Sequence, residues 1–323
     1  MLIVSPDMRI DLHQHLWPEQ LIDALRRRTA PPAIEGRNGA TVLRLAHEPD
    51  GEIDLSRHRP DVRLAALDEA GVDRAVVSLS TPLGIEALPA PEAAELIAAY
   101  HNGLAEISAS AGGRIAAWAA APLAEDDAGA STVAGALDQG FVGASLPSAA
   151  LASRDDIDRV APLLDLLERR GAPLFVHPGP APGTPPYARV AGMPDWWPNL
   201  GAYPGLSISA FFAWRAAGSA RWPRLRVCFA IMAGAGPFLE ERWRTFSGER
   251  GAIDRNVFLD TASCGRLALE CALATYGVEQ VVFGTDIPVI GAAPVGRALA
   301  ELGPAVVEAV TASNPLRLLE PRE

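Results

Sequence analysis

Two histidines separated by one residue, His13 and His15, stand at the end of an apolar run, residues 8–12. Successive side chains of an extended strand point to opposite faces, so these two imidazoles would point the same way. Imidazole nitrogens are common ligands of zinc and similar divalent metals. The pair therefore predicts half of a metal site, which needs further ligands from elsewhere in the chain.

A third histidine and an aspartate follow two other apolar runs. His177 ends the run 174–176, and Asp286 follows the run 282–285. Three imidazoles and one carboxylate are a suitable ligand set for one divalent ion, with a coordination position left for water. Such an ion lowers the pKa of its water toward neutrality, and Asp286 would take or relay the proton.

The elements that must position these residues alternate along the chain. From residue 60 onward, helical segments that end near a glycine are followed by short apolar runs. Continuously apolar strands alternating with helices are typical of a parallel sheet covered on both faces. Eight strands in about 300 residues favour a (β/α)8 TIM barrel over an open doubly wound sheet. The predicted strands are 8–12, 75–79, 115–121, 141–146, 173–177, 225–232, 257–261 and 280–284, and the predicted helices are 18–28, 60–70, 91–111, 128–137, 155–170, 206–217, 237–246 and 266–276.

A barrel would bring the four candidate ligands to one place. Active sites of such barrels lie at the carboxyl ends of the strands, where loops from different strands meet. His13, His15, His177 and Asp286 each end or follow a predicted strand, although they are far apart in sequence. The sequence therefore predicts a metal centre in the mouth of a single barrel domain, residues 1–323.

Two segments depart from the repeating pattern. In the insertion after the first strand, residues 33–59, two short alternating runs flank Pro49-Asp50-Gly51, which predicts a hairpin. The long connection 178–204 is rich in proline and glycine and carries Tyr187, Trp196 and Trp197. A loop of this length either covers a substrate or packs on the surface, and both alternatives stay open.

The composition excludes several classes of function. The formal net charge is −11 and no basic stripe is present, which argues against a nucleic-acid partner. The sequence contains no lysine, so a Schiff-base lysine and a carbamylated lysine between two metals are both excluded. The three cysteines form no Cys-x-x-Cys pair, and no run of about 18 apolar residues occurs. A cytoplasmic protein outside the membrane is expected.

Several motifs resemble the amidohydrolase superfamily, in particular the amidohydrolase-related branch that includes aminocarboxymuconate-semialdehyde decarboxylase, resorcylate-type decarboxylases and dicarboxylate lactonases. The resemblance implies that His13, His15, His177 and Asp286 bind one divalent metal ion, with zinc as the first expectation. Strand four offers no lysine or glutamate in Gly143-Ala144-Ser145-Leu146, so a mononuclear site is expected. The matching segments, which span nearly the whole chain, are 10–15, 176–178, 236–242, 258–261, 283–288 and 314–319.

One position departs from the family pattern. The family has a histidine after strand six, in an Ala-His-x-Gly-Gly context, where it activates water or carries a proton. Here the segment reads Ala230-Ile231-Met232-Ala233-Gly234, with Ile231 in place of that histidine. An isoleucine cannot transfer protons, so more of the proton transfer must fall on Asp286.

The resemblance leaves three functions open. The first is a metal-dependent hydrolase that uses metal-activated water to cleave a C–N or C–O bond of a small organic substrate. The second is a nonoxidative decarboxylase of an aromatic or unsaturated acid, which the missing histidine disfavours more because carbon protonation needs a placed acid. The third is a non-catalytic metal-binding barrel.

Substrate contacts and assembly are less constrained by the sequence. Trp196, Trp197 and Tyr187 of the long loop are candidate contacts, as are Arg44 and His47 of the insertion, which in relatives can overhang the barrel mouth. The expected partner is a small-molecule substrate. A homodimer, which is common in this branch, stays open as the state of assembly.

Overall fold

The structure of the chain is a computed structural model. It describes residues 8–46, 48–125, 127–185, 192–194, 196–249, 253–290 and 293–320.

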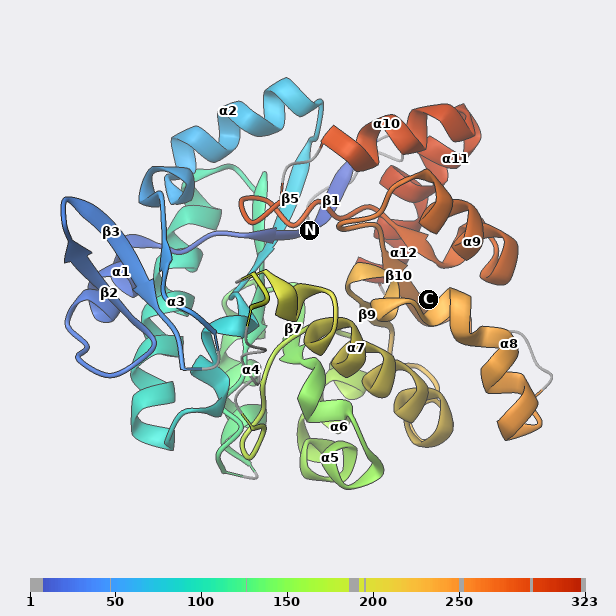
Figure 1. Ribbon diagram of the computed structural model, residues 1–323, viewed down its shortest axis with the longest axis horizontal. Helices are drawn as coiled ribbons and strands as arrows, with labels where there is room; N and C mark the ends of the chain where they lie inside the picture. The colour runs from blue at the N-terminus through green and yellow to red at the C-terminus, as the bar shows by residue number, and fades with distance from the viewer. Residues whose placement is uncertain are drawn as a thin grey trace.

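Eight parallel strands form the barrel (Figure 1). The first and last strands are joined by a hydrogen bond from Leu12 N to Phe283 O, 3.0 Å, and by a bridge between Gln14 and Ile287. These contacts close the sheet, so the predicted TIM barrel is confirmed. In order around the sheet, the strands are β1 (Ile10–His15), β5 (Arg74–Ser78), β6 (Ile115–Ala120), β7 (Gly143–Pro147), β8 (Leu174–His177), β9 (Val227–Phe229), β10 (Val257–Asp260) and β11 (Val281–Val282).

Helices surround the strands, and their ends follow the proline and glycine signals in the sequence. In α2, Pro60 occupies the first turn, where its missing N–H costs nothing, and Gly71 ends the helix with φ +62°. The same pattern recurs in α6, which Gly171 ends. The helices are α1 (Glu19–Arg26), α2 (Pro60–Ala70), α3 (Ala90–Ser110), α4 (Ala128–Asp138), α5 (Arg154–Arg159), α6 (Ala161–Arg170), α7 (Ala202–Ala213), α8 (Gly236–Ser247), α9 (Arg266–Tyr276), α10 (Ala293–Leu302), α11 (Pro304–Glu308) and α12 (Asn314–Leu319).

The core has two layers. Side chains that point into the barrel, among them Leu12, Trp118 and Phe175, form one buried cluster. The other faces of the strands pack against the helices in a larger cluster. Both faces of the strands are thus covered, which explains why the strand sequences are continuously apolar rather than alternating.

Some predicted boundaries were wrong. The segment 155–170 is two helices, α5 and α6, separated at Val160, with Pro162 in the first turn of the second helix. Strand β9 ends at Phe229 instead of residue 232, because the next residues turn into a left-handed conformation. No helix bounds were predicted after residue 284, where α10, α11 and α12 lie.

The insertion after β1 is a three-stranded antiparallel sheet, β2 (Ala33–Arg37), β3 (Ala40–Arg44) and β4 (Gly51–Glu52). The predicted pairing of β3 with β4 is confirmed. The additional strand, β2, joins β3 through Asn38-Gly39, whose φ angles are both positive. Asn-Gly is the preferred pair for such a two-residue hairpin, so this strand had a readable signal.

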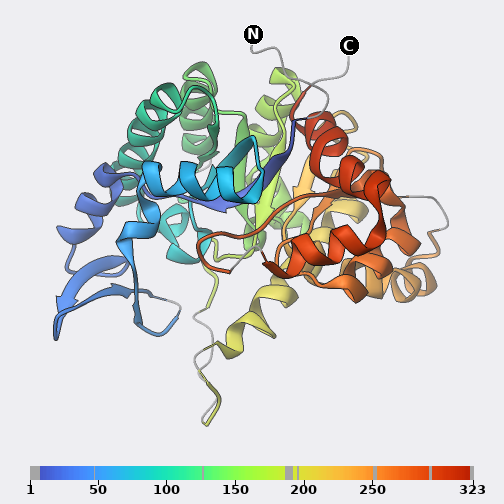
Figure 2. The same cartoon turned by 90° about the horizontal axis from the view of Figure 1, so that it is seen from above.

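The described part of the long connection after β8 that leads into α7, drawn in yellow, stands out from the barrel in Figure 2. Its described part includes a short helical turn, Trp197–Asn199, and leads into α7. No helix within the described ranges is long and apolar enough to cross a membrane.

Candidate metal centre

The structure brings the four predicted ligands together in the mouth of the barrel. His13 and His15 lie at the end of β1, His177 ends β8, and Asp286 follows β11. One ligand atom from each residue lies within 4.8 Å of the others, and all four residues are buried. The convergence follows from the parallel barrel, which places the carboxyl ends of all its strands on one side.

The ligand atoms face one another across a small space. Nε2 of His13 lies 3.3 Å from Nε2 of His15. Oδ1 of Asp286 lies 3.4 Å from Nε2 of His13 and 3.0 Å from Nε2 of His15. The ring of His177 stands edge-on to the other two, with centroid distances of 4.8 and 5.0 Å. The four side chains therefore surround one point.

The opposite nitrogen of each histidine faces an acceptor. Nδ1 of His13 lies 2.6 Å from Oδ2 of Asp260, and Nδ1 of His15 lies 3.2 Å from the carbonyl oxygen of Ser78. Nδ1 of His177 lies 2.9 Å from the carbonyl oxygen of Pro178. A nitrogen that faces a carbonyl or carboxylate carries the proton, so each Nε2 is left as the lone-pair donor.

These residues fit a divalent cation. Three Nε2 lone pairs and a carboxylate repel one another unless a positive charge lies between them. Oδ1 of Asp286 is buried and has no hydrogen-bond partner among the described residues. Three nitrogens and one oxygen are a donor set that zinc and related divalent ions accept. The site can hold one such ion.

The pKa shifts of the side chains also indicate that the site favours a positive charge. Burial lowers the pKa of His13, but the carboxylates of Asp260 and Asp286 more than offset it and raise this pKa to about 10. Burial raises the pKa of Asp286, but the neighbouring imidazoles of His13 and His15 bring it well below its usual value. Burial and these two histidines lower the pKa of His177. Without a metal ion, a second proton on the His13 ring therefore supplies the positive charge of the site.

The backbone holds Asp286 in an uncommon conformation. Its φ angle is +62°, in the left-handed region that non-glycine residues rarely adopt. Its N–H donates to the carbonyl oxygen of His13, 2.8 Å away, and the N–H of His15 donates to the carbonyl oxygen of Ile287, 2.7 Å away. These bonds turn the carboxylate back toward the histidines. Strain of this kind is common at functional sites.

A buried network of polar side chains holds in place the segments that carry the metal ligands. Asp11 accepts hydrogen bonds from Oγ1 of Thr285, 2.6 Å, and from Nε2 of Gln14, 2.7 Å. Arg63, which is only 2% exposed, donates to Oε1 of Gln14 and to the carbonyl oxygen of His15. The network connects α2, β1 and the segment after β11, and the last two carry three of the four ligands. These supports were not predicted, because the partners of Arg63 and Thr285 are distant in sequence.

The position of the expected strand-six histidine is occupied by an aliphatic side chain. Ile231 is half-buried and closely follows β9. Its backbone N–H donates to Oδ1 of Asp260, 2.8 Å away. Asp260 lies at the end of β10, so the rule that selects His177, a polar residue at a strand end, would also have selected this aspartate.

Another histidine lies beside the ligands. His58 is 5% exposed and stacks on Trp17 at a centroid distance of 4.4 Å. Its Nδ1 accepts the backbone N–H of Trp17, so its proton is on Nε2. Burial, Arg63 and His15 lower the pKa of His58 to about 3, which keeps the ring neutral. His58 is thus a neutral ring with a fixed tautomer, close enough to His15 to interact electrostatically.

The predicted substrate contacts differ in exposure and in their partners, and two of them lie outside the described residues. Trp196 and Trp197 are 55% and 37% exposed, with ring centroids 6.2 Å apart. Arg44 donates to the carbonyl oxygen of Thr29, and its guanidinium lies 3.6 Å from Glu35. The structure therefore shows Arg44 engaged by Glu35 of the insertion and by Thr29, which precedes it. Tyr187 and His47 lie outside the described residues.

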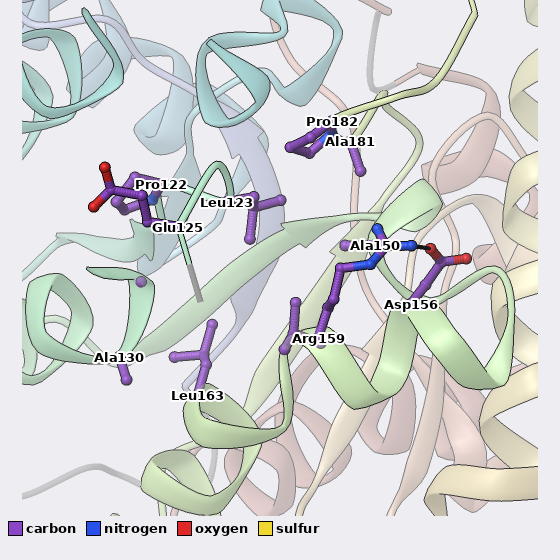
Figure 3. A pocket seen from close by; sticks show the side chains of 12 residues that line it. Pro122, Leu123, Glu125, Ala130, Ala150, Asp156, Arg159, Leu163, Ala181 and Pro182 are labelled. Carbon is purple, nitrogen blue, oxygen red and sulfur yellow. Dashed lines mark ion pairs between the residues drawn. The ribbon is translucent and has the colours of Figure 1, made fainter. Parts of the chain in front are cut away.

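A separate cleft lies beside the barrel mouth (Figure 3). Its lining comes from α4, α5, α6 and the segments after β6, β7 and β8, and it includes an ion pair between Asp156 and Arg159, 3.1 Å apart. None of its lining residues is one of the four metal ligands, so the cleft is separate from the metal centre.

Comparison with known proteins agrees with this architecture. The model of the amidohydrolase family matches residues 10–320. No curated protein matches the sequence significantly. The chain is nevertheless similar over almost its whole length to several solved structures.

Three of these structures are informative. IDCase of Metarhizium anisopliae, solved in apo form, has a TM-score of 0.82 at 21% identity, covering 98% of both chains. The 5-carboxyvanillate decarboxylase LigW of Sphingomonas paucimobilis has a TM-score of 0.73 at 20% identity, covering 98% of this chain and 100% of that one. A 5-carboxyvanillate decarboxylase of Novosphingobium aromaticivorans with bound manganese, a D314N mutant, has a TM-score of 0.72 at 17% identity, covering 97% of both. At these identities, the similarity shows the shared fold.

Proposed function

This chain belongs to the amidohydrolase family and is an enzyme, and we propose that it hydrolyses a C–N or C–O bond of a small organic substrate with one divalent metal ion. The observation that carries the proposal is the position of Asp286. Its Oδ1 is buried, faces Nε2 of His13 and of His15, and has no hydrogen-bond donor within the described segments. Hydrolysis needs a group that takes a proton from water, and a carboxylate placed here can do so.

The histidines would hold the ion. His13, His15 and His177 each present Nε2 to the centre while Nδ1 is anchored by an acceptor. The ion would supply Lewis acidity, polarising a substrate oxygen and acidifying water. Zinc is our first choice for three nitrogens and one oxygen, and manganese, found in the Novosphingobium protein, is the second.

Asp286 would carry the proton through the reaction. Its carboxylate would accept a proton as water attacks the substrate, and would return that proton to the leaving nitrogen or oxygen. The bond to the leaving group then breaks with its electron pair on the leaving atom, and Asp286 is regenerated. Ile231 cannot share this role because an aliphatic side chain has no titratable group. The reaction therefore depends on a single carboxylate.

Nonoxidative decarboxylation is the second candidate, and the names of the similar solved structures favour it. In this reaction the bond between the carboxylate and its carbon breaks, carbon dioxide leaves, and the carbon takes up a proton. Asp286 would then have to deliver a proton rather than accept one. The absence of an imidazole at position 231 weighs against this reaction, because it removes a second source of the proton.

A substrate panel separates the two reactions. The purified protein, loaded with zinc or manganese, would be incubated with esters, lactones and amides and, separately, with aromatic and unsaturated carboxylic acids. Hydrolysis without carbon dioxide release is the expected result. Carbon dioxide release from the acids alone would replace this proposal with the decarboxylase. Binding of a divalent ion with no turnover of either group would leave the non-catalytic metal-binding barrel, and failure to bind any divalent ion would overturn both metal-dependent reactions.

Trp196, Trp197, Tyr187, Arg44 and His47 are retained as proposed substrate contacts. An aromatic pair on an exposed loop can cover a flat substrate when it binds, which the position of Trp196 and Trp197 supports. We further propose a cytoplasmic enzyme whose partner is its small-molecule substrate. A homodimer would be recognised by sedimentation of the purified protein.

A further inference from the structure

The carboxylate of Asp260 connects a metal ligand to a backbone turn. Asp260 ends β10 and is fully buried. Its Oδ2 lies 2.6 Å from Nδ1 of His13. Its Oδ1 accepts the backbone N–H of Ile231, 2.8 Å away, and that of Ala262, 3.0 Å away. Oδ2 thus contacts a metal ligand, and Oδ1 is held by two backbone N–H groups.

The N–H of Ile231 reaches Asp260 from an unusual backbone conformation. Ile231, Met232 and Ala233 have φ angles of +49°, +52° and +52°, and Gly234 continues with +70°. For L-residues other than glycine, this conformation costs about 1–2 kcal/mol per residue. It is least favourable for a β-branched side chain such as that of Ile231. A run of this kind persists only where the surrounding structure requires it.

Packing on the opposite side confines the turn. A Cβ atom on Gly234 would overlap the carbonyl oxygen of Pro204 in α7. Met232 and Ala233 are both buried. The turn 231–234 is therefore wedged between α7 and the end of β10. It cannot relax away from Asp260 without moving a helix.

We propose that Asp260 is a positioning residue of the metal centre and that the left-handed turn 231–234 holds its carboxylate in place. Asp260 keeps the proton of His13 on Nδ1 and orients the ring, so that Nε2 points to the ion. This inference rests on the proposed metal-dependent function and deepens it. It also explains the turn: at position 231 the site uses the backbone N–H, which an isoleucine supplies as well as a histidine.

A purely structural role for Asp260 makes a different prediction. A buried carboxylate that accepts two backbone N–H bonds stabilises the loops whether or not an ion is present. In that case its replacement would lower stability and leave metal affinity unchanged. A residue that orients a ligand histidine typically changes metal affinity 10- to 100-fold when it is replaced.

The test compares metal affinity in three proteins. Zinc and manganese dissociation constants of the full chain would be measured by competition with a chromogenic chelator. Asp260→Asn keeps the size of the side chain and removes its charge, and we expect it to weaken binding about 10- to 100-fold. Asp165→Asn is the matched control: it makes the same exchange in α6, where the carboxylate accepts from Nε1 of Trp222, and we expect its affinity to stay within about twofold of wild type. Equal affinity in Asp260→Asn and wild type would overturn the inference.

A second measurement needs no variant at position 260. In the zinc-loaded wild-type protein labelled with ¹⁵N-histidine, the Nδ1 proton of His13 should give a slowly exchanging resonance far downfield. Its contact with Phe175, whose ring lies 5.0 Å from that of His13, allows the assignment. Zinc on Nε2 leaves a proton on Nδ1 in any case, but without a strong hydrogen bond to Asp260 that proton would be neither shifted far downfield nor slow to exchange, and this result would also overturn the inference. A His13 ring that carries its proton on Nε2, or none on Nδ1, would overturn the inference even if Asp260→Asn does not fold.

The outcomes also distinguish this inference from the proposed function. If the wild-type chain binds neither metal, the proposed function fails and this inference fails with it. If the wild-type chain binds metal and Asp260→Asn binds it equally well, the proposed function stands and only the positioning role is lost.

Discussion

The backbone N–H of Asp286 donates to the carbonyl oxygen of His13 over 2.8 Å, so the carboxylate ligand is attached to the first histidine ligand. The same strand end carries His15, whose N–H donates to the carbonyl oxygen of Ile287. The three ligands from the first and last strands are therefore fixed relative to one another by main-chain hydrogen bonds. Only His177 is contributed by another part of the barrel.

Replacement of Asp286 tests its role as proton carrier. Asp286→Asn keeps the shape of the side chain but cannot accept a proton, so we expect kcat to fall at least about 100-fold. Turnover would be measured at saturating metal, because the variant also binds the ion more weakly. Circular dichroism of the metal-free variant would serve as the control for folding. Unchanged turnover would exclude Asp286 as the proton carrier.

Arg63 should be important for stability, although its partners are the backbone and a glutamine rather than any metal ligand side chain. Arg63→Met would leave the carbonyl oxygens of His15 and Arg57 and Oε1 of Gln14 without their donor. Buried acceptors left without a partner are costly, so we expect the free energy of unfolding to fall by about 2–4 kcal/mol. Urea denaturation of the metal-free protein would measure the change. Arg59→Met is the matched control, since Arg59 is 64% exposed and pairs with Asp61 on the surface.

Glu86 should make the stability of the protein depend on pH. This side chain is fully buried, neither carboxyl oxygen has a hydrogen-bond partner within the described part of the chain, and burial raises its pKa to about 8. The folded protein therefore keeps this proton up to about pH 8, whereas the unfolded chain releases it near the ordinary glutamate pKa of 4.5. Between these values the unfolded state binds fewer protons, so stability falls as pH rises.

Glu86→Gln should remove this dependence. We expect the variant to gain roughly 2–3 kcal/mol over wild type between pH 5 and pH 7.5, with little difference at pH 4. Thermal unfolding at several pH values would show the effect. Glu95→Gln, the same exchange at an exposed position, is the control. A constant difference for Glu86→Gln would contradict the prediction.

The turn after β9 offers a stabilising substitution. Ala235 is exposed and has a φ angle of +121°, which glycine adopts at no steric cost. We expect Ala235→Gly to raise the free energy of unfolding by about 1 kcal/mol. The same exchange at Ala98, which is exposed in the middle of α3, should lower it by about 1 kcal/mol. Destabilisation of both variants in denaturant unfolding would refute the assignment of strain to Ala235.

The ligands could be predicted from the sequence because each ends or follows an apolar run. A parallel barrel places the carboxyl ends of all its strands on one side, so residues at strand ends lie close together. His13 and Asp286 therefore meet although 273 positions separate them. The β3–β4 pairing was predicted for a similar local reason. The strand β2 was missed although the pair Asn38-Gly39 signalled it.

The supports of the site could not be predicted in the same way. The bond between Asp260 and His13 joins residues 247 positions apart, and neither neighbouring sequence specifies the partner. The left-handed turn at Ile231 runs against local preference, since a β-branched residue there would be assigned to the preceding strand. That is the reason the prediction extended β9 to residue 232. Tertiary packing against α7 overrides the local preference.

The hydrogen bonds between β1 and the segment after β11 also join the first and last strands of the barrel. His13 and His15 belong to the first barrel strand that is made, and Asp286 follows the last one. Three of the four ligands therefore meet only after the full circle of strands has closed. A partly folded chain would lack the complete ligand set, so tight capture of an ion would report completed folding and would in turn stabilise the closed barrel.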